Sequence, residues 1–109
     1  MLGRQVKTAV DIGTIIVETP GTLGGRPRIS GTRIGVHAVA QHVAYGVSPE
    51  ELVSEAYWPY LSLAQVYAAL AYYHAHKEEI DADIREEAEL YDRLAGEASR
   101  NRPPVLRRE

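Results

Sequence analysis

Two closely spaced helix-start signals constrain the fold of this chain more than any other feature. The stretch Ser48–Glu51 supplies an N-cap serine, a proline suited to the first helical position and a glutamate that completes a capping box. Ser62 and Gln65 repeat the box before an apolar run. Pro59 stands between the two signals and prevents one continuous helix. The pattern therefore predicts two helices with a short connection, the first of them ending near Ala56.

A further helix is predicted on either side of this pair. Apolar residues recur at helical spacing over Val36–Tyr45, and Gly46 suits the end of that helix. The helix after Ser62 extends through Tyr73, and its apolar period then continues to Ala98, so it either runs on or kinks near Lys77. These are the elements of a three-helix helix-turn-helix core followed by a long amphipathic helix. Another small helical bundle fits the same pattern.

The N-terminal part predicts a β-hairpin. Thr14–Glu18 and Arg28–Ser30 are short and rich in β-branched residues, with Pro-Gly and Gly-Gly pairs between them. A lone hairpin is barely stable in water, so it must pack on the helices or on another subunit. We expect an N-terminal arm over residues 1–13, with a short strand at Val6–Val10. The hairpin and helix-turn-helix then occupy residues 14–77, and a partner-binding helix and tail occupy residues 78–109.

The charge distribution suggests different partners for different segments. The net charge is −3, which argues against general nucleic-acid binding. Residues 77–97 have three cations against nine acids, whereas residues 98–109 have four arginines against one glutamate. An acidic helix is therefore predicted to lead into a basic tail.

Several function classes find no support in the residues. The chain has no cysteine, which excludes disulfides, thiolate zinc sites and thiol nucleophiles and fits a cytoplasmic protein. No nucleophile stands beside a suitable base, and the histidines lack the spacing of a metal site. We therefore expect no enzyme activity, no metal and no cofactor. No apolar run approaches the ~20 residues of a membrane span, so no membrane association is expected.

The stretch Gly24–Val36 resembles the signature of a known family. It reads Gly-Gly-Arg-Pro-Arg-Ile-Ser-Gly-Thr-Arg-Ile-Gly-Val, which is similar to the pattern of the family called domain of unknown function 433. The similarity continues through Gly46–Leu52 and Pro59–Tyr73 and departs at Gly35, where the family often has proline. The resemblance implies a mainly α fold, with a homeodomain-like helix-turn-helix preceded by a β-hairpin.

The resemblance also implies a function. Many members look like antitoxins of type II toxin-antitoxin pairs, which bind a PIN-like ribonuclease toxin through a C-terminal extension and repress their own operon. We therefore expect a homodimeric antitoxin that binds operator DNA. A symmetric contact at the hairpin or near Trp58 is predicted for the dimer, although an aromatic cluster such as Trp58 with Tyr57 and Tyr60 also suits a core. The alternative function is a protein-interaction adaptor that no longer reads DNA.

The predicted DNA contacts form two groups. Arginines of the glycine-rich stretch would meet phosphates, and the start of the third helix would enter the major groove. The predicted residues are Arg26, Arg28, Arg33, Ser62, Ala64, Gln65, Ala68 and Tyr72. Two alternatives stay open, because Arg33 also suits a pair with Glu50, Glu51 or Glu55 and Gln65 also suits a pure capping role. The predicted reading helix has no arginine or lysine, which favours the adaptor function.

The predicted toxin contacts lie beyond Lys77. An apolar stripe would lie in a groove of the toxin, and the tail arginines would reach the acidic metal site of a ribonuclease. The predicted residues are Ile80, Ile84, Tyr91, Leu94, Arg100, Arg102, Arg107 and Arg108. A solvated acidic helix with a tail that binds nothing is the simpler alternative.

Overall fold

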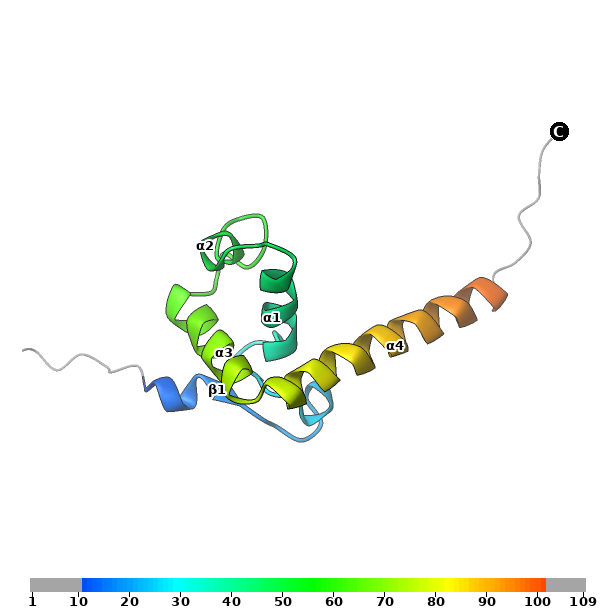
Figure 1. Ribbon diagram of the computed structural model, residues 1–109, viewed down its shortest axis with the longest axis horizontal. Coiled ribbons are helices and arrows are strands. Elements are labelled where there is room, and N and C mark those ends of the chain that lie inside the picture. The colour runs from blue at the N-terminus through cyan, green and yellow to red at the C-terminus, as the bar shows by residue number, and fades with distance from the viewer. Residues whose placement is uncertain (1–10, 102–109) are drawn as a thin grey trace, which may run out of the picture.

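The computed structural model describes residues 11–101 and shows a mainly helical protein with one small antiparallel sheet (Figure 1). The elements in chain order are the 3₁₀ helix η1 (Ile12–Thr14), β1 (Ile16–Val17), the 3₁₀ helix η2 (Leu23–Gly25), β2 (Arg28–Ile29), α1 (Val36–Ala44), α2 (Pro49–Leu52), α3 (Leu63–Ala75) and α4 (Lys77–Asn101). The predicted strand at Val6–Val10 lies outside the described residues.

The predicted hairpin is confirmed, with shorter strands than the sequence pattern suggested. Strands β1 and β2 pair antiparallel, with Ile16 opposite Ile29 and Val17 opposite Arg28. Both strands contact α3, and the Ile29 side chain is fully buried. The helical core therefore supplies the apolar cover that so small a sheet needs.

Both capping boxes form as predicted. The Ser48 hydroxyl accepts from the Glu51 backbone N–H at 3.1 Å, and the Glu51 carboxylate accepts from the Ser48 N–H at 3.3 Å. Ser62 and Gln65 make the same reciprocal pair at 3.2 and 2.8 Å. Each box satisfies two backbone groups that have no partner within the helix, so the starts of α2 and α3 are set locally.

The prediction that the second helix reaches Ala56 is wrong. Helix α2 ends at Leu52, and the Ser54 hydroxyl then donates to the Glu51 carbonyl at 2.6 Å. The same hydroxyl accepts from the Ala56 N–H at 3.3 Å, and the Trp58 N–H donates to the Leu52 carbonyl at 2.9 Å. The serine side chain thus competes with helical hydrogen bonding and helps turn the chain toward Pro59.

Helices α3 and α4 are separate, with the break at His76. Its backbone angles, φ −132° and ψ 44°, are not helical, and its N–H donates to the Tyr72 carbonyl at 2.9 Å. The His76 ring stacks on the Tyr72 ring with centroids 4.3 Å apart. Of the two alternatives that the apolar period left open, the structure shows the kink near Lys77. Among the described helices, none combines the length and apolar character that crossing a bilayer requires.

The first turns of α4 belong to the core, and its remainder leaves the body of the molecule (Figure 1). Ile80 is 0% exposed and Ile84 packs against the buried cluster formed by α1, α3 and the hairpin. A domain boundary between residues 77 and 78 would therefore cut through the apolar core. The part of α4 that is free of the body begins after Glu87.

Candidate protein-binding helix

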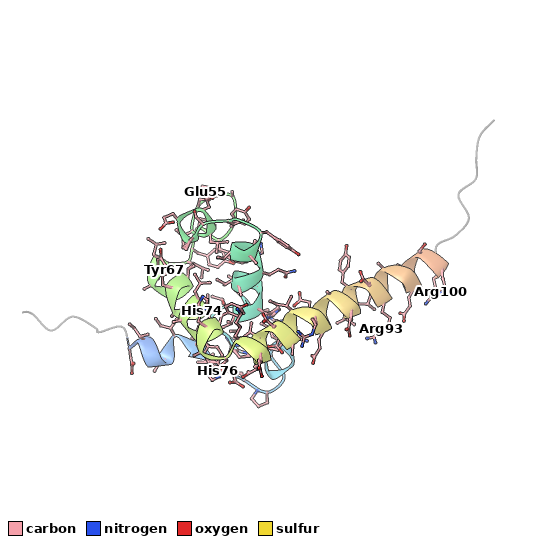
Figure 2. All side chains as sticks on the ribbon, in the orientation of Figure 1. Glu55, Tyr67, His74, His76, Arg93 and Arg100 are labelled. Carbon is pink, nitrogen blue, oxygen red and sulfur yellow. The ribbon has the colours of Figure 1, made fainter. Side chains whose placement is uncertain are left out.

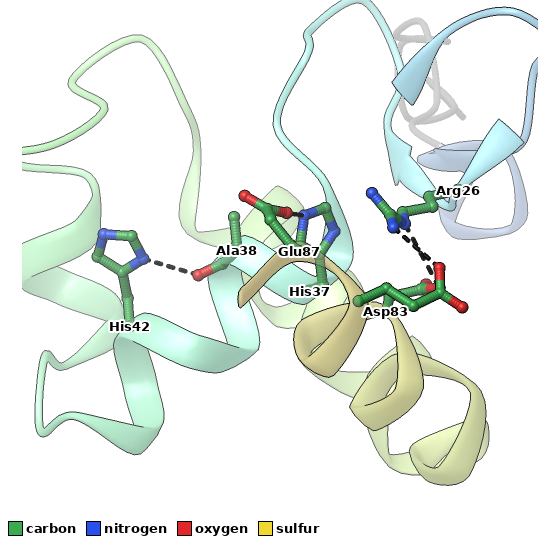
Figure 3. Close-up of polar contacts among 7 residues, drawn as sticks. Arg26, His37, Ala38, His42, Asp83 and Glu87 are labelled. Atoms are coloured by element: carbon green, nitrogen blue, oxygen red, sulfur yellow. Dashed lines mark hydrogen bonds and ion pairs between the residues drawn. The ribbon is translucent and has the colours of Figure 1, made fainter. Parts of the chain in front are cut away.

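Charged contacts fasten α4 to the loop that precedes β2. The Arg26 guanidinium lies 3.5 Å from an Asp83 carboxylate oxygen and 3.1 Å from one of Glu86 (Figure 3). The Arg26 and Asp83 side chains are mostly buried, whereas Glu86 is exposed. A buried guanidinium needs this compensation, so Arg26 serves to hold α4 in place.

A second contact joins α4 to α1. His37, at the start of α1, is only 4% exposed, and its Nε2 contacts the Glu87 carboxylate (Figure 3). The Nδ1 atom of the same ring is buried without a hydrogen-bond partner among the described residues. The ring occupies the space where a side chain at Gly35 would begin. Gly35 and His37 are thus a matched pair, because the ring leaves no space for a Cβ atom at position 35.

Beyond these contacts α4 carries an unpaired apolar surface. Tyr91 is 73% exposed and Leu94 is 53% exposed, and exposed alanines lie near them in the sequence. Arg93 and Arg100 lie on the same projecting part of α4 (Figure 2). We call this surface the distal face of α4; it comprises Ala88, Tyr91, Leu94, Ala95 and Ala98. The residues recur at three- and four-residue spacing and continue the stripe by which Ile80 and Ile84 pack on the body.

A groove of about 270 Å³ marks the junction of the distal face and the body. Gln41 of α1 forms one wall of the groove. The other wall is formed by α4, through Ile84, Glu87, Ala88, Tyr91 and Asp92. A segment that docks on the distal face would therefore also reach α1.

The predicted toxin contacts divide into three groups. Ile80 was expected on the docking surface but is fully buried, and Ile84 is half-buried against the core, because the apolar stripe of α4 packs on the body in its first turns. Tyr91, Leu94 and Arg100 are exposed on the free part of the helix. The last group, Arg102, Arg107 and Arg108, lies outside the described residues.

The three predicted phosphate-binding arginines have different environments. Arg26 forms ion pairs with Asp83 and Glu86 of α4. Arg28 donates to the Thr32 carbonyl at 2.9 Å and to the Thr19 hydroxyl at 3.0 Å, so it braces the hairpin. Arg33 is exposed and forms no ion pair with any residue from 11 to 101, including Glu50, Glu51 and Glu55, which were considered as partners. Of these three arginines, therefore, only Arg33 has a guanidinium that is exposed and makes no ion pair with the described residues.

The predicted base-reading positions on α3 also differ from one another. Ser62 and Gln65 are engaged in their capping box, and Ala68 is only 8% exposed, so its methyl group faces the core. Tyr72 donates to the Glu18 carboxylate at 3.0 Å, and burial together with this hydrogen bond raises the pKa of Tyr72 to about 12. Ala64 alone of these positions is exposed without a side-chain contact of its own.

The outer surface of α2 and α3 is acidic. The Tyr67 hydroxyl donates to Glu50 at 3.2 Å, and the charge of that glutamate raises the pKa of Tyr67. Glu51 and Glu55 are also exposed nearby in the sequence, and α3 contains no arginine or lysine. Close approach of DNA phosphates to this surface is electrostatically unfavourable.

The aromatic cluster around Trp58 closes the end of α1. Trp58 is half-buried and packs with the core, and the His42 ring lies 4.9 Å from it and 5.5 Å from the Tyr57 ring, centroid to centroid. His42 is held by a 2.7 Å hydrogen bond to the Ala38 carbonyl (Figure 3). The core alternative for Trp58 therefore has direct support, while Tyr60 nearby remains exposed.

Sequence reasoning missed both contacts that dock α4. Arg26 was interpreted as a phosphate ligand, and the histidines were considered as metal ligands and found to lack the spacing. Their partners lie more than forty residues away in the chain, and no local pattern links them. In the sequence, only the glycine at position 35, directly before α1, hinted that a neighbouring side chain packs closely against the backbone there. Within residues 11–101, no group of three or more His, Cys, Asp or Glu side chains is arranged to hold a metal ion.

Comparison with known proteins relates the part of the chain from β1 into α3 to a known family. The family described as protein of unknown function (DUF433) matches residues 16–73, which extend from β1 into α3. A crystal structure of a DUF433 member protein from Anabaena variabilis is 36% identical; the match covers 66% of this chain and 69% of that one, with a TM-score of 0.61. No match was found among curated proteins. The family region ends before α4 begins.

Proposed function

This chain belongs to the DUF433 family, and from that premise we propose that it is an antitoxin that neutralises a PIN-like ribonuclease by binding it through the distal face of α4. The observation that carries the proposal is the exposure of Tyr91 and Leu94 on a helix that projects from an otherwise packed body. In this proposal α1 to α3 form a helix-turn-helix scaffold, and α4 is the binding element.

Three features support a binding role for this part of α4. Large exposed apolar side chains gathered on one helical face suit docking into a groove of another protein. Aromatic residues such as Tyr91 are common among the residues that dominate interface energy. The contacts of Arg26 and His37 fix the direction in which α4 leaves the body, so little ordering of its base is needed on binding.

The proposal predicts a PIN-like ribonuclease encoded beside this chain, and co-expression with that ribonuclease tests it. The double variant Tyr91→Glu/Leu94→Glu should weaken binding at least 100-fold, because it places two charges in the apolar contact, and growth should no longer be protected. The matched control is Glu89→Gln/Arg93→Gln, which changes two exposed residues on the opposite side of the same helix and should still protect. Protection by the Tyr91/Leu94 variant, or the absence of any such ribonuclease partner, would refute the assignment.

Repression of its own operon by a dimer is a second candidate function. The order of α1, α2 and α3, with both later helices capped, supports it, as does the free guanidinium of Arg33. The acidic surface of α2 and α3 opposes it, so any DNA affinity must come from Arg33 and from residues outside α3.

An electrophoretic mobility shift assay with DNA from the promoter of the gene for this chain measures DNA binding directly. At low salt, Arg33→Ala should weaken a real complex roughly tenfold, whereas Ala64→Ser on exposed α3 should change it little if α3 does not read bases. If no shift appears even at low salt, the chain is a protein-interaction module that does not read DNA.

A further inference from the structure

The groove at the base of the distal face carries negative charge that no lysine or arginine balances. The carboxylates of Glu87 and Asp92 line it, and no lysine or arginine stands among the described residues that form its walls. Asp92 is exposed and forms no ion pair within residues 11–101. The Glu87 carboxylate contacts His37 through Oε2 (Figure 3), and its side chain remains 53% exposed, so Oε1 is available to another group.

A second hollow, formed by other residues of α4, gives an internal comparison. It has a volume of about 290 Å³ and is lined by Arg26, Glu86, Glu89, Leu90 and Arg93. Two arginines match two glutamates in this lining, and the Arg26 guanidinium lies 3.1 Å from a Glu86 carboxylate oxygen. The second hollow is therefore neutral by itself. The missing cation is a property of the first groove and does not simply follow from the acidic composition of α4.

We propose that the first groove receives an arginine side chain of the ribonuclease, carried on an amphipathic helix whose apolar residues cover the distal face. The inference rests on the proposed function and specifies the chemistry of the partner. The methylene stem of an arginine would pack on Ile84 and Ala88, and its guanidinium would reach the carboxylates of Glu87 and Asp92. The ring of Tyr91, which also lines the groove, suits contact with a guanidinium plane.

Gln41, on the opposite wall, favours arginine over lysine. Its Nε2 donates to the Tyr45 hydroxyl at 3.3 Å, which leaves its amide oxygen able to accept a hydrogen bond in the groove. Acceptors therefore stand on both walls, an amide oxygen on α1 and two carboxylates on α4. A guanidinium has several N–H donors in a planar fork and can bridge the two walls, whereas the ammonium group of lysine is a compact point charge.

The geometry of α4 also sets where this arginine stands in the partner. Ala88, in the groove, and Leu94, on the distal face, are about 9 Å apart along the helix axis. A partner helix packed alongside α4 therefore presents its arginine about six or seven residues from the apolar residue that contacts Leu94. Further apolar residues are expected between the two at helical spacing. This pattern identifies the expected helix in the sequence of the ribonuclease.

Amide NMR of the full isotope-labelled chain tests the groove without a ribonuclease. The probe is N-acetyl-arginine methylamide, and the matched control is its citrulline analogue, in which a neutral urea replaces the guanidinium. The arginine probe should shift the signals of Gln41, Ala88 and Asp92 with a millimolar dissociation constant, which Asp92→Asn should raise about threefold. The signals of Glu89 and Leu90, at the second hollow, should not move. Equal shifts from both probes, or no saturable shift up to about 50 mM, would overturn the assignment.

Affinity for the ribonuclease supplies the second measurement. Asp92→Asn should weaken the complex roughly tenfold and reduce its salt dependence, whereas Glu89→Gln, which removes one charge from the second hollow, should leave the affinity unchanged. Replacing one arginine of the partner helix should have an effect that is not additive with Asp92→Asn. A complex that needs Tyr91 and Leu94 but is indifferent to Asp92→Asn would overturn the arginine contact and leave neutralisation standing. A ribonuclease that does not bind would overturn neutralisation, and the probe titration would still decide whether the groove selects a guanidinium.

Discussion

Replacing Ile80 with alanine should lower the free energy of unfolding by about 3 kcal/mol. Ile80 is fully buried although it lies on α4, the element that a sequence-based boundary would separate from the core. The substitution leaves a cavity between α4 and the body and removes part of the apolar surface that anchors the helix. Denaturant unfolding followed by circular dichroism, at a fixed low protein concentration, measures the change.

Arg85→Ala is the control for this prediction. Arg85 is exposed on the same helix and forms no ion pair with the described residues, and arginine and alanine both favour helix. Its substitution should change the unfolding free energy by less than about 0.5 kcal/mol. An Ile80→Ala variant as stable as Arg85→Ala would mean that α4 does not dock through its first turns, and that residues 14–77 fold without it.

The second large effect is expected at Gly35. Its backbone angles, φ −76° and ψ 153°, suit any residue, so the constraint is steric rather than conformational. A methyl group there would overlap the His37 ring, which is buried and tied to Glu87. Gly35→Ala should therefore displace the ring, break its contact with α4 and lower the free energy of unfolding by about 2 kcal/mol.

Two further variants separate this steric effect from a general cost of alanine. Gly96→Ala places a methyl group 3.6 Å from the Arg100 guanidinium, an ordinary contact, and should stabilise α4 by up to about 1 kcal/mol. Gly35→Ala should be less damaging in a His37→Ala background, because the imidazole that it overlaps is then absent. Equal losses in both backgrounds would contradict the steric pairing of Gly35 with His37.

The sequence predicted well wherever short-range chemistry decides the structure. The capping boxes at Ser48 and Ser62 were predicted with their partners, because each box joins residues three apart and needs no other part of the chain. The hairpin and the helix from Val36 were also predicted, because β-branched runs with turn residues and a helical apolar period are visible in short stretches of sequence. The end of α2 was missed, because the Ser54 hydroxyl takes over a hydrogen bond that helix propensity would assign to the backbone.

The candidate site was predicted only in part. Tyr91 and Leu94 were identified from their period and are exposed, whereas Ile80, in the same stripe, is buried. A helical period indicates which residues share a face but does not indicate what covers that face at each turn. The stripe of α4 is covered by its own body at one end and exposed at the other, and only the position of α4 relative to α1 distinguishes the two.

The starts of α2 and α3 constrain the fold more than any other sequence feature. They were determined by the sequence itself, since the hydrogen bonds of their capping boxes are local. The position of α4 was decided by tertiary structure alone. It depends on Arg26 meeting Asp83 and on His37 meeting Glu87, pairs separated by more than forty residues. Such pairs form only after the core has brought α1, the hairpin and α4 together, and the distal face of α4 is the surface that this packing leaves exposed.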